Sequence, residues 1–83
     1  MPETRAYEVV IPRMELDQDT VVLVSWLREE GDRVVKGEPI MEIETGKTNV
    51  AIDAGATGTL IAQLVAEGVE VNVGTVVGLI GPE

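Results

Sequence analysis

Lys47 is the residue of this chain whose type and setting could do chemistry. It lies between Gly46 and Thr48 in the stretch EIETGKTNVAID, residues 42–53. A lysine amine can hold a phosphate, accept an acyl group as an amide, or simply carry a solvated charge. The chain has only two lysines, Lys36 and Lys47, against 15 acidic residues, so a lysine displayed on a turn would stand out from its surroundings.

The setting of Lys47 does not match a phosphate-binding loop. Such a loop reads G-x-x-x-x-G-K-[ST], because glycine N–H groups must wrap the phosphates ahead of a helix N-terminus. The position five residues before Gly46 is Met41, and Thr48 is followed by NVAID, which is typical of a strand. The amine is therefore either an ordinary solvated charge or a site of covalent attachment.

Missing residue types and net charge exclude several function classes. The chain has no Cys and no His, which excludes disulfides, thiol nucleophiles, Cys/His zinc sites and histidine general bases. No acidic residues have the spacing of a metal site. The net charge of −9 argues against nucleic acid and against an anionic membrane surface, and it favours basic partner surfaces.

Length and composition predict one small soluble domain. With 83 residues the chain can bury only a modest core, and Trp26 and Tyr7 are its only aromatic residues. The start, MPETRAYE, lacks a basic stretch followed by an apolar one, and no apolar run approaches the length of a membrane span. We therefore expect an untargeted, cytoplasmic protein.

Strand signals dominate the chain. Short runs rich in β-branched residues alternate with Gly, Asp and Pro turn signals, which is typical of an all-β sandwich or barrel. The one helical alternative covers residues 21–30, but its β-branched start and the Gly31-Asp32 stop favour a strand. The predicted strands are residues 7–11, 21–27, 33–35, 40–44, 49–53, 59–64, 70–73 and 76–80.

An internal repeat indicates how these strands are arranged. Residues 21–43 align with residues 58–80 after a shift of 37 positions, and EEGDRVVKG then matches AEGVEVNVG. Repeats of this length indicate one supersecondary unit used more than once. The sequence therefore predicts two similar halves that face each other across a single core. The matched pairs include Leu23 with Leu60, Leu27 with Leu64, Glu30 with Glu67, Gly31 with Gly68, and Gly37 with Gly74.

After the first copy the chain continues as a hairpin that would carry Lys47 at its tip. Residues 40–44 and 49–53 form the two strands, and residues 45–48 form the turn. Such a turn holds the Cα atom of Lys47 still while its side chain stays free to swing. Met41, Ile43, Val50 and Ile52 are predicted to face inward, and Glu42, Glu44, Asn49, Ala51 and Asp53 outward.

From residue 7 to residue 80 the sequence resembles the lipoyl domain of the acyltransferase (E2) components of 2-oxo acid dehydrogenase complexes. The resemblance rests on the ordered set VVIPRM, SWLREEGDRVVKGEPIMEIETGK and GTLIAQLVAEGVEVNVGTVVGLI. It implies an all-β, flattened barrel-sandwich of two antiparallel four-stranded sheets with pseudo-two-fold symmetry. It also implies that lipoic acid is attached covalently to Lys47, with Gly46 and Thr48 flanking it in the turn.

The resemblance further implies a swinging-arm carrier without catalysis of its own. The lipoyl group would be attached by a lipoate ligase or lipoyl transferase. It would be acylated by a thiamin-dependent decarboxylase (E1), would deliver the acyl group to coenzyme A at an acyltransferase core (E2), and would be reoxidised by dihydrolipoamide dehydrogenase (E3). An acyltransferase of this family needs a catalytic His, which this chain lacks. Residues 1–81 would be the carrier domain of a longer acyltransferase, and residues 82–83 the start of a linker.

Two other assignments remain open. A biotinyl carrier domain shares the fold but has its lysine between two methionines, whereas an unmodified structural module would use the same fold without any attached group. This chain also departs from the lipoyl pattern. Gly46 replaces the usual Asp before the lysine and should permit a positive φ, and Gly55 stands where a proline is common, which predicts a looser loop. The loop with Asp17 and Asp19 should lie near the lysine turn.

Overall fold

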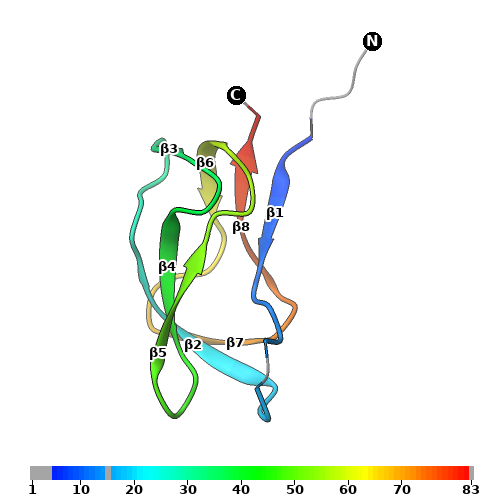
Figure 1. Ribbon diagram of the computed structural model, residues 1–83, viewed down its shortest axis with the longest axis vertical. Helices are drawn as coiled ribbons and strands as arrows, with labels where there is room; N and C mark the ends of the chain where they lie inside the picture. The colour runs from blue at the N-terminus through cyan, green and yellow to red at the C-terminus, as the bar shows by residue number, and fades with distance from the viewer. Residues whose placement is uncertain (1–4, 15, 83) are drawn as a thin grey trace.

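The computed structural model describes residues 5–14 and 16–82, which form eight β-strands and no helix (Figure 1). All eight predicted strands are confirmed, each with ends within one residue of the prediction. The stretch that could have been a helix is a strand up to Trp26. The strands are β1 (Tyr7–Val10), β2 (Thr20–Trp26), β3 (Arg33–Val34), β4 (Pro39–Glu44), β5 (Asn49–Asp53), β6 (Gly58–Gln63), β7 (Val69–Asn72) and β8 (Val76–Gly81).

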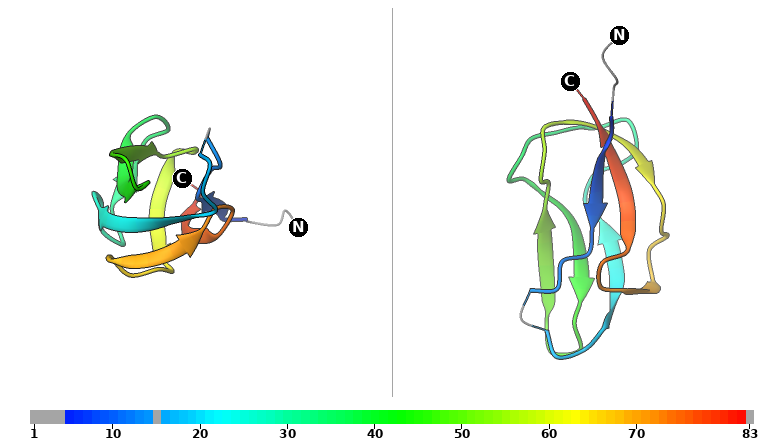
Figure 2. Two further views of the ribbon diagram at one scale, coloured as in Figure 1. Left: turned by 90° about the horizontal axis from the view of Figure 1, so that it is seen from below. Right: turned by 90° about the vertical axis from the view of Figure 1, so that its right-hand side faces the viewer.

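The strands form two antiparallel four-stranded sheets, as predicted. One sheet has the order β1-β8-β6-β3 and the other has the order β5-β4-β2-β7. The sheets face each other and enclose the core (Figure 2). The β4–β5 turn lies at one end of the molecule, whereas β1 begins and β8 ends side by side at the opposite end (Figure 1).

The sheet orders show the predicted two-fold relation directly. A shift of 37 residues carries β2 onto β6, β3 onto β7 and β4 onto β8. Strands β5 and β1, which lie outside the repeat, then occupy equivalent edges beside β4 and β8. The strand pairing follows the same relation. Met41 of β4 pairs with Ile52 of β5, and Gly78 of β8, which is equivalent to Met41, pairs with Val9 of β1.

Reciprocal hydrogen bonds join the two halves. Gly31 N–H donates to Leu60 O at 2.8 Å, and Gly68 N–H donates to Leu23 O at 2.7 Å. Both glycines have positive φ, +97° and +86°, which an L-residue adopts only with strain. Each half thus ends its first strand with a glycine turn that is fastened to the other half.

The core is aliphatic, because the chain contains no Phe and its single Trp is only half-buried. Side chains from both sheets interlock at near-zero exposure, which is the close packing that a small domain needs. They include Ile11, Val21, Leu23, Val34, Ile40, Met41, Ile43, Leu60, Val77 and Ile80. Trp26 closes one side of this core, and its indole Nε1–H donates to Val65 O at 3.0 Å.

The loop that joins the two halves begins with two backbone hydrogen bonds, and the expectation that Gly55 loosens it stays a prediction. Ala54 N–H donates to Glu38 O at 2.7 Å, and Ala54 O accepts from Gly37 N–H at 2.9 Å. Gly55 lies against Tyr7, and a Cβ atom there would lie 2.6 Å from Tyr7 Cζ. A side chain at this position would therefore require the exposed Tyr7 ring to move.

Within the described residues, no helix is long and apolar enough to cross a membrane. The last strand, β8, ends at Gly81, which pairs with Thr59. The assignment of residues 82–83 to a linker remains a prediction, and Glu83 lies outside the described residues.

Candidate functional site

The β4–β5 turn is closed from the inside by a threonine. Glu44 and Asn49 form the last pair of the ladder, and four residues connect them. Thr45 is 4% exposed, and both its N–H and its Oγ1–H donate to Thr48 O, at 3.0 and 3.1 Å. These two bonds fix the base of the turn and leave Lys47 as its apex.

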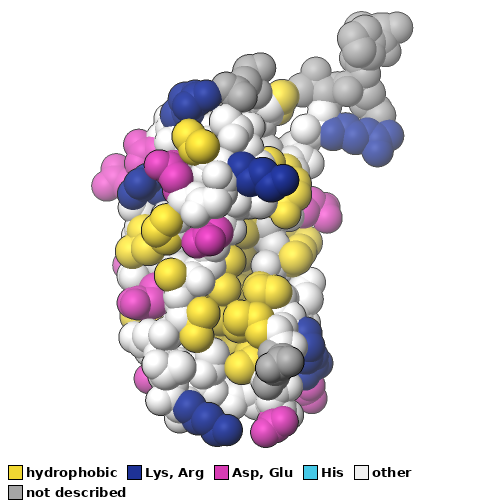
Figure 3. Space-filling view, viewed as in Figure 1, with side chains coloured by type: hydrophobic (Ala, Val, Ile, Leu, Met, Phe, Trp, Pro, Cys, Tyr) yellow, Lys and Arg dark blue, Asp and Glu magenta, His cyan; other side chains and the backbone are white. Residues whose placement is uncertain are grey.

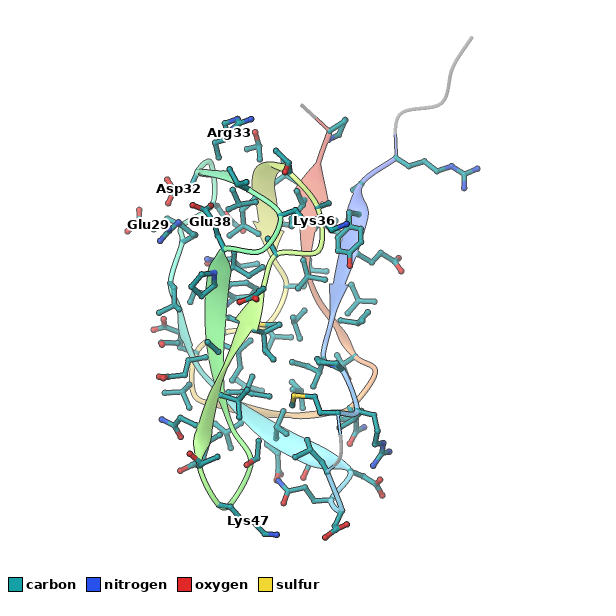
Figure 4. The ribbon with its side chains drawn as sticks, viewed as in Figure 1. Glu29, Asp32, Arg33, Lys36, Glu38 and Lys47 are labelled. Carbon is teal, nitrogen blue, oxygen red and sulfur yellow. The ribbon has the colours of Figure 1, made fainter. Side chains whose placement is uncertain are left out.

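Lys47 is exposed at the far tip of the hairpin (Figure 4). Across residues 5–14 and 16–82, no side chain forms a hydrogen bond or ion pair with its amine. Lys36, the other lysine, lies at the opposite end of the molecule (Figure 4). The structure thus places Lys47 on an exposed hairpin turn, and the assignment of this lysine as the attachment site stays a prediction.

Gly46 sets the shape of the tip. Its φ is +94°, as its residue type predicted. A Cβ atom at this position would lie 3.2 Å from Gln18 Oε1, which is closer than ordinary van der Waals contact. A side chain before the lysine would therefore require the Gln18 side chain to shift.

The loop between β1 and β2 packs beside the turn and is braced by hydrogen bonds. Arg13 donates to Gln18 O at 3.2 Å and pairs with Asp19 Oδ1 at 3.0 Å. Gln18 Nε2–H in turn donates to Thr20 O at 2.9 Å. Asp17 lies at the lysine site, as expected, whereas Asp19 turns to Arg13.

A mostly apolar recess of about 320 Å³ opens between this loop and the hairpin. Figure 3 shows hydrophobic side chains gathered in a hollow on this face, above the tip of the molecule. Met14 contributes from an unusual backbone conformation, with a φ of +51°. The recess is lined by Met14, Leu16, Asp17, Gln18, Thr45, Lys47, Thr48 and Val50.

The sequence predicted the lysine, its turn and the nearby loop, but it did not single out Thr45, Met14, Leu16 or Gln18. Thr45 could have been recognised, because Thr hydroxyls commonly bond to nearby backbone groups in turns. Gln18 and Met14 carry no such local signal, because their positions depend on how the β1–β2 loop packs against the hairpin.

A two-sheet, two-fold domain that presents one lysine on a hairpin tip is the architecture of a carrier for a covalently attached group. The comparison with known families agrees: residues 8–80 match the biotin/lipoyl family, described as "Biotin-requiring enzyme". The chain belongs to this family, and it is a domain of the lipoyl type.

Three relatives at 30% identity or more are named as parts of the 2-oxoglutarate dehydrogenase complex, the acetoin cleaving system and pyruvate dehydrogenase. The chain is 36% identical over 74 residues to the dihydrolipoyllysine-residue succinyltransferase component of the 2-oxoglutarate dehydrogenase complex of Staphylococcus saprophyticus, covering 89% of this chain and 18% of the relative. It is 38% identical over 76 residues to the acetyltransferase component of the acetoin cleaving system of Bacillus subtilis, covering 92% and 19%. It is also 38% identical over 68 residues to the pyruvate dehydrogenase E1 component subunit beta of Rhizobium meliloti, covering 78% and 15%. The chain thus spans less than a fifth of the length of each.

The fold has a close counterpart among solved structures. The NMR structure of the lipoyl domain of the 2-oxoglutarate dehydrogenase complex from Azotobacter vinelandii matches with a TM-score of 0.68. The match covers 94% of this chain and 95% of that chain at 23% identity. It supports the architecture described above.

Proposed function

We propose that this domain is a swinging-arm carrier whose Lys47 Nζ forms an amide with lipoic acid. The observation that carries the proposal is the exposed amine, without a partner among the described residues, at the apex of a turn that two Thr45 hydrogen bonds close. A fixed Cα with a mobile side chain suits both the attaching enzyme and an arm that must visit several sites. Because the domain is tethered, each transfer becomes intramolecular, and its rate depends on effective concentration.

The residues around Lys47 fit a lipoyl group. The amine forms no ion pair with a carboxylate among the described residues. The recess beside it offers apolar contacts from Leu16 and Val50. The bound group would supply a disulfide that can be reduced and acylated, chemistry that a chain without cysteine cannot provide itself. The domain's own residues attach, position and present this group.

We propose the partners by the same reasoning. They are a lipoate ligase or lipoyl transferase, a thiamin-dependent decarboxylase, an acyltransferase core and dihydrolipoamide dehydrogenase. The names of the relatives, which include succinyltransferase and acetyltransferase components, support a 2-oxo acid or acetoin system. They also support an acyltransferase as the parent chain, with a decarboxylase β subunit as the alternative.

Biotin is the second candidate group, because the family includes biotin-dependent enzymes. The neighbours of Lys47 favour lipoate, since Gly46 and Thr48 stand where a biotinyl domain has methionines. Two of the three relatives compared above carry dihydrolipoyllysine in their full names, which supports the same choice.

The test is an intact-mass measurement after incubation of the purified domain with lipoate ligase, lipoate and ATP. We expect one lipoyl adduct on the wild type and on Lys36→Arg, and none on Lys47→Arg. Circular dichroism should show that Lys47→Arg remains folded, because the side chain it changes is exposed. An adduct on Lys47→Arg would overturn the assignment of the site, and labelling by biotin ligase but not by lipoate ligase would overturn the assignment of the group.

A further inference from the structure

We propose that the recess beside Lys47 is a resting site for the lipoyl group that the same lysine carries. This inference rests on the proposed function. It adds that the arm is not uniformly free in solvent but returns to a defined position on its own domain. In that position Met14 and residues 16–18 form one wall, and the hairpin forms the other.

The recess is reachable because Lys47 is itself part of its lining. The attachment atom therefore lies at the edge of the recess, and the remainder of the arm can fold inward without crossing the domain. The volume of about 320 Å³ lies at the small end of the range of roughly 300–1,000 Å³ that is typical of small-molecule sites. A ligand with one short chain and one small ring suits a site of this size.

The chemistry of the walls matches a hydrocarbon chain that ends in two sulfurs. Leu16 and Val50 are half-buried and pack against the core, so they form a fixed apolar floor. Met14 adds a flexible thioether, which is polarisable and adapts to irregular partners. Among the polar side chains, Gln18 Nε2–H and Thr45 Oγ1–H already donate to backbone carbonyls, so they do not require a polar ligand.

The backbone conformation of Met14 is a separate observation that supports a functional role for this wall. Its φ of +51° makes it the one residue other than glycine with positive φ among those described, and such strain tends to persist at functional sites. The loop holds it in place, because Leu16 N–H donates to Arg13 O at 3.2 Å and Arg13 bonds to Gln18 O and Asp19. The strained backbone directs a half-exposed methionine to the rim of the recess.

Modification would switch the preference of this side chain from water to the recess. The free amine is a strongly hydrated charge that avoids an apolar surface. Amide formation removes that charge, so the modified side chain loses its reason to stay in water. Occupancy of the recess should therefore begin only when the lysine is modified.

The test uses methyl-labelled domain in three states: unmodified, lipoylated, and octanoylated at the same lysine. Intact mass first confirms full modification. In the lipoylated domain we expect nuclear Overhauser contacts between the dithiolane protons and the methyl groups of Met14, Leu16 and Val50. The octanoylated domain, which lacks the sulfurs, should show contacts from its chain, because apolar burial is the main attraction.

Matched variants separate the recess from general surface contact. Val50→Thr keeps the branched shape but adds a hydroxyl to the floor, and it should cause loss of the dithiolane contacts. Val69→Thr makes the same change on an exposed strand residue outside the recess, and it should leave the contacts intact. If Val50→Thr is poorly folded, Met14→Gln on the rim replaces it.

The outcomes distinguish this inference from the proposed function. A fully lipoylated domain without contacts to these methyl groups would overturn the resting site and leave the carrier function standing. A domain that lipoate ligase does not modify would overturn the carrier function itself. Equal loss of contacts in Val50→Thr and Val69→Thr would also contradict the resting site.

Discussion

Gly46 determines the tip of the hairpin through its backbone. The resemblance to lipoyl domains implies an acidic residue before the lysine, whereas Gly46 has a φ of +94° and lies beside the amide of Gln18. The two features reinforce each other, because both penalise any side chain. The surface next to Lys47 is thus shaped by Gln18 and Asp17 from another loop, and the partner enzyme would meet those side chains there.

Replacing Gly46 with Ala should destabilise the domain more than the same change at Gly74. Both positions have φ near +93°, so both variants should lose about 1 kcal/mol from the left-handed backbone. Only Gly46 has a neighbour within 4 Å of the added Cβ, namely Gln18, whereas Gly74 has none. Urea denaturation of both variants measures the difference. The difference should vanish in a Gln18→Ala background, and its persistence there would contradict the proposed contact.

The predictability of the site follows from whether a signal is local. Lys47, the turn and the positive φ of Gly46 all follow from residues 45–48, and each was predicted from sequence. The contact of Gly46 with Gln18 joins two loops that are 28 positions apart (46 − 18). A contact of that kind depends on tertiary packing, so no pattern within the sequence could reveal it.

The hairpin that carries the site shows the limits of strand alternation. Met41 and Ile43 are buried, as alternation predicted, but Ile40 is also buried at 0% exposure. The ladder shifts between Pro39 and Met41, and such an irregularity lets two consecutive side chains face the core. Val50 is only half-buried because it borders the recess, and Glu42 is half-buried on the outer face.

Two symmetry-related glutamates should contribute equally to stability. Glu30 Oε2 accepts from Gln63 N–H at 2.7 Å, and Glu67 Oε2 accepts from Trp26 N–H at 2.8 Å. Each bond joins a loop of one half to a strand of the other. We expect Glu30→Ala and Glu67→Ala each to lower the free energy of unfolding by about 1 kcal/mol, and the Gln variants to lower it less, because they keep an acceptor oxygen.

The control for these glutamates is Glu8→Ala, which removes an exposed carboxylate on β1 without losing a described hydrogen bond. Thermal and urea unfolding would provide the comparison. A loss from Glu8→Ala as large as those from the two loop glutamates would show that charge, and not the reciprocal bonds, determines the effect.

At the level of the whole fold, the repeat predicted the two-fold relation but not the strand order. The shift of 37 residues indicated that the halves were equivalent, and the sheets confirm it. In the structure β3 joins the sheet of β6, and β7 joins the sheet of β2. The sequence could not predict this exchange, because the same pattern of apolar residues would also fit β3 and β7 each in the sheet of its own half. The exchange of β3 and β7 between halves interlocks them, so the halves should unfold together.

The distance between the tip and the chain ends leads to a further prediction. A folded domain fused after Pro82 should leave the initial rate of lipoylation unchanged, because β8 ends opposite the tip (Figure 1). A short Gly-Ser insertion between Asp17 and Gln18 should reduce the rate, since it displaces the loop beside Lys47. Intact-mass time courses would compare the two. A fusion that slows modification as much as the insertion does would contradict the open approach to the tip.

The β4–β5 ladder ends at Glu44 and Asn49, which a four-residue turn connects, whereas the β1–β8 ladder, its equivalent in the other sheet, ends at Tyr7 and Ile80, which no turn connects. The connected end presents Lys47, and the opposite end is where β1 begins and β8 ends. Tension on the flanking chain would therefore act at the end of the domain opposite Lys47. The Lys47 side chain would keep its full range of movement.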